Sequence, residues 1–388
     1  MSLGGDHMSR SGLYIKNVSG HLSYQSFRPS TLPPKPPIKI DDRLNHKLKV
    51  CYRLLGELNG VSRLIPNKAL FISMYVRKEA LLSSQIEGTQ ATLDDIFDPH
   101  IDKNINQDTE EVIQYLKALR HANERFNQLP ISTRFLKEIH AVLLSSSRGK
   151  EKEPGQLRQT QNWIGATGEP LNKARFIPPN IEDMHQALSE LEKYIHENND
   201  EDLIIKIGLV HYQFETIHPF LDGNGRLGRL LITLLLKQYN LLNEDTLYLS
   251  YYLKKNRIEY YDRLMEVRLK GHYEQWLLFF VEGVIESAKH ALKTIDDLLS
   301  LRTKNMQLLS SLKGSQKTTA LALFDYIEAH PIIDITETSQ NINKAFNTTS
   351  KAVDKFIELG ILKQVQGHKR YRTFAYEPYL KILRDGTE

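Results

Sequence analysis

The sequence contains a single cysteine, Cys51, among its 388 residues. One thiol can neither close an internal disulfide nor supply a cysteine-rich zinc site, so a reducing compartment is expected. No uninterrupted apolar run approaches the roughly eighteen residues that a membrane-spanning helix needs, and the N-terminus lacks the apolar segment of a secretory signal. The protein is therefore expected to be cytoplasmic and without a membrane partner. Met1 to Asp6 are expected to be an added leader ahead of a second start at Met8.

A strong excess of either charge is also absent. The chain has 51 Lys and Arg residues against 47 Asp and Glu residues, which leaves a net charge of +4. That excess is too small for nucleic-acid binding by the chain as a whole, so any such role must be local. Hydrophobic residues make up 40% and charged residues 25% of the chain, which is ordinary globular usage and argues against wholesale disorder. The length suggests two or three domains at roughly 100–200 residues each.

Helical periodicity dominates the first 312 residues. Five prolines within residues 28–37 exclude a helix there and favour an extended arm. A helix break is expected at Asn59-Gly60. The period is lost between Pro154 and Pro179, and this stretch, hereafter the flap segment, is predicted to be a β-hairpin. The predicted helices cover residues 41–58, 67–87, 110–129, 132–144, 181–197, 201–217, 226–239, 255–270 and 273–312.

The region after residue 312 has its own pattern of elements. Helices are predicted at residues 317–329, 336–345 and 348–359, followed by two strands at 361–365 and 370–376 around Gly367. This order is typical of a winged helix-turn-helix domain. Residues 313–388 carry 11 Lys or Arg residues and 9 Asp or Glu residues, so DNA binding would need clustered charge. The basic residues cluster only at Lys363 and at 368–372, and a protein-contact role stays equally open.

The most informative stretch is the segment from His218 to Arg229, whose sequence is HPFLDGNGRLGR. An apolar helix ends before Pro219, a glycine-containing loop follows, and a second apolar helix opens near Arg226. The amides of Gly223, Asn224 and Gly225 can therefore point at an anion at a helix N-terminus. Arg226 and Arg229 are three residues apart, so both can face the same anion.

Two further side chains in this segment suit the chemistry of phosphorus. Asp222 offers a hard oxygen ligand for Mg²⁺, which commonly takes one carboxylate together with phosphate oxygens and water. His218 is the nearby group that can accept a proton near neutral pH. An anion cradle, a metal ligand, an arginine clamp and a base together indicate transfer of a phosphorus-centred group. A Walker-type phosphate loop is absent from the sequence.

This segment resembles the signature of the Fic family, His-x-Phe-x-Asp/Glu-Gly-Asn-Gly-Arg-x-x-Arg, at all of its specified positions. The resemblance implies a helical fold and, in most members, transfer of AMP from ATP to a hydroxyl side chain of a protein. It also implies roles for individual residues: His218 as base, Phe220 as core anchor, Asp222 as Mg²⁺ ligand, Asn224 as α-phosphate contact, and Arg226 and Arg229 as β,γ-phosphate clamp. The implied nucleotide-binding set is Gly223, Asn224, Gly225, Arg226, Leu227, Gly228, Arg229 and, from a later stretch that resembles an adenosine pocket, Asn256.

A second resemblance lies earlier in the chain. Fic proteins carry a short inhibitory motif, Ser/Thr-x-x-x-Glu-Gly/Asn, which Ser83, Glu87 and Gly88 fit. By this likeness Glu87 would enter the nucleotide site and restrain the enzyme. A glutamate in the last turn of a helix also opposes the helix macrodipole, so it needs another partner.

The sequence therefore predicts a mainly α fold, a Fic-like helical bundle with a β-hairpin flap, plus a C-terminal winged helix-turn-helix domain. The predicted divisions are 1–100 for the N-terminal arm and inhibitory helix region, 101–312 for the Fic-like core and 313–388 for the winged-helix domain. The predicted activity is that of a protein adenylyltransferase that uses ATP and Mg²⁺ and is autoinhibited by Glu87. A phosphodiester hydrolase that removes AMP, and a DNA-binding regulator, are the alternatives.

The expected partner is a target protein that presents a Ser, Thr or Tyr hydroxyl, including another part of this chain itself. The flap segment occupies the place where the family pairs with an extended piece of the target by strand addition. DNA contact through residues 313–388 and a homo-oligomer are further expectations.

Overall fold

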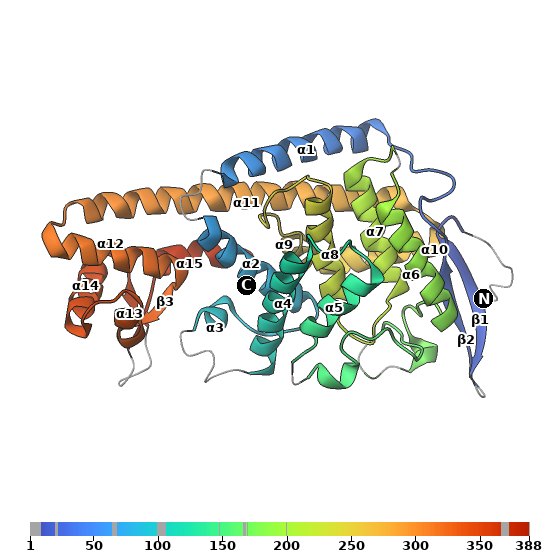
Figure 1. The fold of residues 1–388 in the computed structure, drawn as a ribbon. Coiled ribbons are helices and arrows are strands. Elements are labelled where there is room, and N and C mark those ends of the chain that lie inside the picture. Colours follow the sequence, from blue (N-terminus) through green and yellow to red (C-terminus); the bar gives the residue numbers. More distant parts are fainter. Residues whose placement is uncertain are drawn as a thin grey trace.

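The computed structural model describes residues 9–19, 22–63, 68–98, 106–146, 148–165, 168, 170–198, 200–365 and 372–387. Within this part of the chain the fold is mainly helical, as predicted, with two small sheets. The longest helix, α11 (Tyr273–Ser310), runs along the molecule with α1 (Asp42–Ser62) beside it (Figure 1). An N-terminal hairpin lies at one end and a group of C-terminal helices at the other (Figure 1). No helix in the described part of the chain is both long and apolar enough to span a bilayer.

The N-terminal hairpin was not expected from the sequence. Strands β1 (Gly12–Ser19) and β2 (Leu22–Pro29) pair antiparallel over their whole length. The strands lack an Asn-Gly or Asp-Gly turn signal between them, so the sequence pattern for a hairpin was weak. The hairpin packs on the flap segment, where the N–H of Phe27 donates to the carbonyl of Ile177 at 2.9 Å. It therefore extends the small amount of β-structure next to the flap.

Helix α1 runs past the predicted break at Asn59-Gly60 and ends at Ser62. Gly60 costs a helix interior about 1 kcal/mol relative to Ala. Burial of the flanking Leu58 outweighs that cost, since its side chain is completely removed from solvent. The helices that follow are α2 (Lys68–Ile86), α3 (Leu93–Phe97), α4 (Gln107–Arg125) and α5 (Thr133–Leu143), of which α3 was not predicted.

The flap segment contains less β-structure than the predicted hairpin. Among its described residues, the pairing is limited to one isolated antiparallel bridge between Ile164 and Phe176. A 3-10 turn at Leu171–Lys173 lies between the two halves. The prolines at 170, 178 and 179 lack the N–H that a ladder requires, which explains why the pairing does not extend. The prediction that two extended stretches meet was right, and the prediction of a regular hairpin was wrong.

The central helices carry most of the buried apolar surface. They are α6 (Ile181–His196), α7 (Leu203–Ile217), α8 (Asn224–Gln238), α9 (Ser250–Lys255) and α10 (Arg257–Lys270). Residues 204–217 of α7 are buried on every side, so α7 is the centre of the core. The helix predicted over 255–270 begins instead at Arg257, because the chain turns at Asn256 between α9 and α10.

The C-terminal region contains the predicted elements in the predicted order, with additions. It consists of α12 (Gly314–Ala329), β3 (Ile332–Asp334), α13 (Ile335–Asn341), α14 (Phe346–Glu358), β4 (Lys363–Gln364), β5 (Thr373–Ala375) and α15 (Glu377–Arg384). The three strands pair in the order β3-β5-β4. Strand β3 and helix α15 were not predicted. The basic residues predicted at 368–371 lie outside the described residues.

Candidate active site

The loop between α7 and α8 begins and ends in left-handed backbone. His218 caps α7 with φ 50° and ψ 60°, and Gly223 precedes α8 with φ 78°. Glycine adopts this conformation freely, whereas a residue with a Cβ loses roughly 1–2 kcal/mol there. The conformation of His218 must therefore be held by its surroundings.

The loop is closed from within by Asn224. Its side-chain oxygen accepts from the N–H of Phe220 at 3.0 Å, and its side-chain NH₂ donates to the carbonyl of Phe220 at 2.8 Å. Phe220 is buried, as expected of a core anchor. Because both ends of the Asn224 amide are engaged here, an α-phosphate contact by Asn224 would come from its backbone N–H.

His140 of α5 contacts two residues of the loop, and the sequence analysis did not identify it. Its ring stacks on Phe220 with 3.8 Å between the ring centroids. The N–H of Gly155 donates to its Nδ1 at 2.9 Å, which places the ring proton on Nε2 for donation to the carbonyl of Asp222 at 2.9 Å. Burial lowers the pKa of His140 to about 4, so the ring is neutral near pH 7. Nothing in the local sequence distinguishes this histidine from an ordinary core residue.

The flap segment holds the same loop from its other side. Arg158 is fully buried, and its Nε donates to the carbonyl of His218 at 3.0 Å. Asn162 donates from its side chain to the carbonyls of His218 and Phe220 at 3.3 and 3.0 Å. Both residues were missed in the sequence, because their partners are backbone atoms some sixty positions away.

Arg229 of α8 is buried and paired with the end of α2. Its Nη2 lies 2.7 Å from Glu87 Oε1, and its Nε donates to the hydroxyl of Ser83 at 2.8 Å. A Cβ placed on Gly225 would lie 2.2 Å from the same Glu87 oxygen. The Glu87 carboxylate thus lies over the first turn of α8, where helix N–H groups favour an anion. The structure brings Ser83 and Glu87 together with the loop as predicted, whereas Gly88 is exposed and shapes the turn after α2 with φ 106°.

Arg226 lies on the same turn and faces two carboxylates at longer range. Its guanidinium nitrogens lie 3.5 Å from Glu111 and 3.5 Å from Asp222. The Nε atom of Arg226 and the Nη1 atom of Arg229 are buried and have no hydrogen-bond partner among the described residues. Two buried donors of this kind beside the N-terminus of α8 suit a multiply charged anion such as a polyphosphate.

Asp222 suits a magnesium ion that is held mainly by phosphate. Its side chain is 48% exposed, so it can reach a ligand above the loop. The described residues contain no cluster of three or more His, Cys, Asp or Glu side chains that would form a protein-only metal site. A single carboxylate together with phosphate oxygens and water is a common arrangement for Mg²⁺.

His218 is electrostatically prepared to act as a base. Burial, followed by the cations Arg268 and Arg158, lowers the pKa of its imidazole to about 4, although the Glu87 carboxylate acts in the opposite direction. Its Nδ1 is buried, so Nε2 is the nitrogen we expect to face a substrate. The lowered pKa leaves the ring neutral at physiological pH and able to accept a proton.

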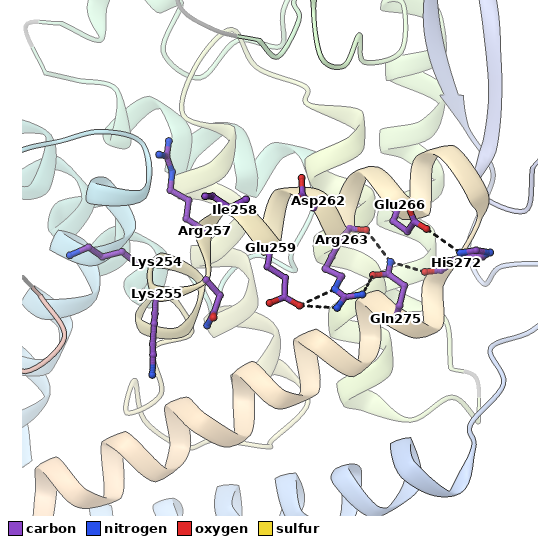
Figure 2. A pocket seen from close by; sticks show the side chains of 11 residues that line it. Lys254, Lys255, Arg257, Ile258, Glu259, Asp262, Arg263, Glu266, His272 and Gln275 are labelled. Atoms are coloured by element: carbon purple, nitrogen blue, oxygen red, sulfur yellow. Dashed lines mark hydrogen bonds and ion pairs between the residues drawn. The ribbon is translucent and has the colours of Figure 1, made fainter. Parts of the chain in front are cut away.

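The remaining predicted contacts lie elsewhere. Leu227 is fully buried, and a Cβ on Gly228 would meet Glu215 of α7 at 2.4 Å, so both face the interior. Asn256 lines a groove beside α10. Charged side chains in this groove pair with one another, as Glu259 does with Arg263 (Figure 2). Tyr261 of α10 does lie near the site, since burial and then the Glu87 carboxylate raise the pKa of its hydroxyl.

Two family models match the parts of the chain that form this site. Residues 46–124 match the family model described as Fic/DOC family N-terminal, and residues 130–236 match that of the Fic/DOC family. The second match contains the whole loop from His218 to Arg229, and the first contains Ser83 and Glu87.

The curated relatives are distant and longer than the matched stretch. The chain is 27% identical to the protein adenylyltransferase Fic of Drosophila melanogaster over 190 residues, which are 47% of this chain and 35% of that protein. It is 25% identical to a probable protein adenylyltransferase of Aquifex aeolicus over 191 residues, 48% of this chain and 54% of that one. The chain thus spans about a third to a half of the length of these relatives.

A solved structure shares the fold over most of the chain. The Fic family protein from Desulfovibrio desulfuricans G20 superposes with a TM-score of 0.56 over 88% of this chain and 98% of that chain, at 18% sequence identity. At this level of sequence identity the likeness shows the fold alone.

Proposed function

We propose that this Fic/DOC-family protein is a protein adenylyltransferase, which moves AMP from ATP to a hydroxyl side chain of a protein, and that Glu87 restrains it. One observation carries the proposal: the Glu87 carboxylate lies on the buried guanidinium of Arg229, above Gly225, at the N-terminus of α8. A helix N-terminus binds carboxylates and phosphates alike, so the Glu87 carboxylate can take the place of a phosphate and can be displaced by one. The adenylyltransferases among the distant relatives support the same activity.

The chemistry assigns one step to each group. The target hydroxyl oxygen attacks the α-phosphorus of ATP, the bond from that phosphorus to the bridging oxygen breaks, and pyrophosphate leaves. The hydroxyl proton passes to Nε2 of His218, which is neutral because burial lowers its pKa. Arg226 and Arg229 bind the β- and γ-phosphates, and backbone amides of the loop bind the α-phosphate. Asp222 would hold Mg²⁺, which neutralises phosphate charge.

The flap segment is the place where we expect the target to bind. Trp163 is 42% exposed beside the bridge at Ile164, and exposed aromatic residues are frequent anchors of protein contacts. Strand addition along this segment would bring a target hydroxyl towards His218. Self-modification and a homo-oligomer stay predictions. DNA contact through residues 313–388 also stays a prediction. Within the basic cluster at 368–372 the structure describes Arg372, whose guanidinium lies over the ring of Phe374.

Hydrolytic removal of AMP is the alternative that the site supports. The Glu87 side chain is 35% exposed, so it could orient a water molecule while a modified side chain lies in the cradle. The two activities respond oppositely to loss of Glu87, because hydrolysis would need the carboxylate and transfer would be relieved of it.

His218→Ala should abolish AMP transfer while leaving ATP binding largely intact. A general base typically contributes about 10²–10⁴-fold in rate, whereas phosphate affinity resides in the arginines and the loop amides. Transfer is followed with labelled ATP and cell lysate, and binding by titration calorimetry. A parallel loss of binding would count against the role of His218 as base.

Glu87→Gly should raise AMP transfer by an order of magnitude or more. A charge-assisted hydrogen bond contributes about 1.5–3 kcal/mol, which corresponds to roughly 10–150-fold in an equilibrium constant. The variant is compared with wild type and with Glu87→Gln, which keeps an acceptor but removes the charge and should be intermediate. Arg229→Ala is the matched control, because it removes the restraint together with the clamp and should stay inactive. Unchanged or lower transfer by folded Glu87→Gly protein would exclude restraint by Glu87 and favour the hydrolase.

A further inference from the structure

Arg158 is a buried cation that is bound by backbone carbonyls. Its Nε donates to His218 at 3.0 Å, its Nη2 to Pro179 at 2.5 Å and its Nη1 to Thr160 at 3.3 Å. Its own N–H donates to the carbonyl of Pro219 at 3.0 Å. Among the described residues it has no carboxylate partner, and its side chain is fully buried. A buried cation without a counter-charge is a poor source of stability, so its presence here calls for another reason.

The reason lies in what its contacts connect. Thr160 lies in the first half of the flap segment and Pro179 at its end. His218 and Pro219 belong to the loop between α7 and α8. Asn162, two positions after Thr160, adds a second hydrogen bond to the carbonyl of His218 at 3.3 Å. Two of these contacts meet at the carbonyl of His218, a residue that has left-handed backbone although it is not glycine.

We propose that Arg158 is a positioning residue that fixes the backbone of the base His218 and couples it to the flap segment, where the target binds. This inference deepens the proposed function and rests on it. When the flap segment is in place, the His218 carbonyl has two donors and its ring is held at one angle to the loop. The charge of Arg158 has a second consequence, because it favours the neutral form of the ring.

The groups that face His218 set the direction of the expected titration. Burial has the largest effect on the His218 pKa; Arg268 of α10 and Arg158 lower the pKa, while Glu87 of α2 and the backbone of Glu215 of α7 raise it. Removing the cation at position 158 should therefore move the pKa of His218 upwards, towards its ordinary value of about 6.5. A larger fraction of the ring would then be protonated, and inactive as a base, near pH 6.

The test compares Arg158→Gln, Arg158→Lys and Asn162→Ala in the Glu87→Gly background, with full-length protein. We expect kcat for transfer to fall by up to about 100-fold in Arg158→Gln, with an unchanged KM for ATP, because a misplaced base affects chemistry and not phosphate binding. Proton NMR of the His218 ring, assigned with His218→Ala, should show a raised pKa in Arg158→Gln and a smaller change in Arg158→Lys. Asn162→Ala should lower kcat without a comparable change in pKa.

An unchanged His218 pKa and kcat in folded Arg158→Gln protein would overturn the inference. So would equal losses of kcat and ATP affinity, which a merely structural role predicts. If Glu87→Gly itself shows no transfer, the proposed function fails, and the NMR titration still decides whether Arg158 sets the state of His218.

A separate set of contacts ties the C-terminal residues to α2, the helix that carries Glu87. Lys78 of α2 is buried, and its Nζ donates to the carbonyl of Asp385 at 2.5 Å. Lys254 donates to the carbonyl of Thr387 at 2.9 Å, and His290 of α11 lies 3.3 Å from the Asp385 carboxylate. Burial lowers the pKa of Lys78 to about 8, which leaves it mostly charged near pH 7. The segment 385–387, hereafter the latch, thus supplies a buried lysine with its acceptor.

Gly386 allows the latch to pack closely against α9. Gly386 has φ 79°, and a Cβ there would lie 2.3 Å from the ring of Tyr251 on α9. Just before the latch, Arg384 of α15 donates to both oxygens of Asp94 of α3 at 2.9 and 2.8 Å. The C-terminal region is therefore bonded to the segments on either side of Glu87, namely α2 before it and α3 after it.

We also infer that the latch holds α2 in the position in which Glu87 reaches Arg229, so that release of the C-terminal region would relieve the restraint. This inference rests on the proposed function and on residues distinct from Arg158. Lys78 lies within α2, and Glu87 follows the last residue of that helix. A contact that fixes Lys78 can therefore fix the position of Glu87, and the C-terminal region would control the active site through α2.

Gly386→Ala tests the latch, and Gly360→Ala is its matched control. Gly360 also has positive φ, at 70°, but a Cβ there would meet nothing within 4 Å. We expect Gly386→Ala to speed hydrogen exchange of the α2 amides and to raise transfer several-fold in wild type, and to add nothing in the Glu87→Gly background. Behaviour of Gly386→Ala like that of Gly360→Ala in both measurements would overturn the inference. If no variant shows transfer, the proposed function fails while the exchange rates still test the latch.

Discussion

The arrangement of this site depends on one buried charge. Arg229 lies in the first turns of α8 almost without solvent contact, and burial alone would lower the pKa of its guanidinium. Nearby acidic groups, of which the Glu87 carboxylate has the largest effect, more than offset burial and raise that pKa. A buried cation of this kind requires an anion. Glu215 and Glu79 lie nearby, but burial raises the pKa of each carboxyl to about 7, so each is protonated for much of the time near neutral pH. The Glu87 side chain is partly exposed to solvent. Under the proposed function, Glu87 is therefore the anion that a phosphate would replace.

Several separate segments converge on the loop that faces this charge. His140 of α5, Arg158 and Asn162 of the flap segment, and Asn224 of α8 each hold a backbone carbonyl or amide between His218 and Asp222. The loop is thereby fixed before any substrate arrives, which reduces the reorganisation needed during reaction. Glu87 contacts Arg229, the proposed phosphate clamp, while the flap segment contacts the backbone of His218, the proposed base. Under the proposed function, inhibition would therefore act on Arg229 of α8, whereas target binding would act on His218 of the loop.

The sequence could predict the loop because its residues are consecutive and their types are unusual together. His218, Asp222, Arg226 and Arg229 follow from the chemistry of anion binding, and the inhibitory role of Glu87 follows only from resemblance. His140 and Arg158 could not be found, because they act through carbonyl groups that any residue possesses and that lie far away in the chain. The helices were predicted well where the apolar period is strong. The N-terminal hairpin, the continuation of α1 through Gly60 and the division at Asn256 depend on tertiary packing, which outweighs local preference.

The most direct measurement of the central claim is the pair of dissociation constants for ATP and AMP, obtained by titration calorimetry on wild type and on Glu87→Gly. If Glu87 and the terminal phosphates compete for Arg229, the substitution should tighten ATP binding by roughly tenfold or more and leave AMP binding unchanged, because AMP lacks those phosphates. An equal change for both nucleotides, or unchanged ATP binding, would contradict the account.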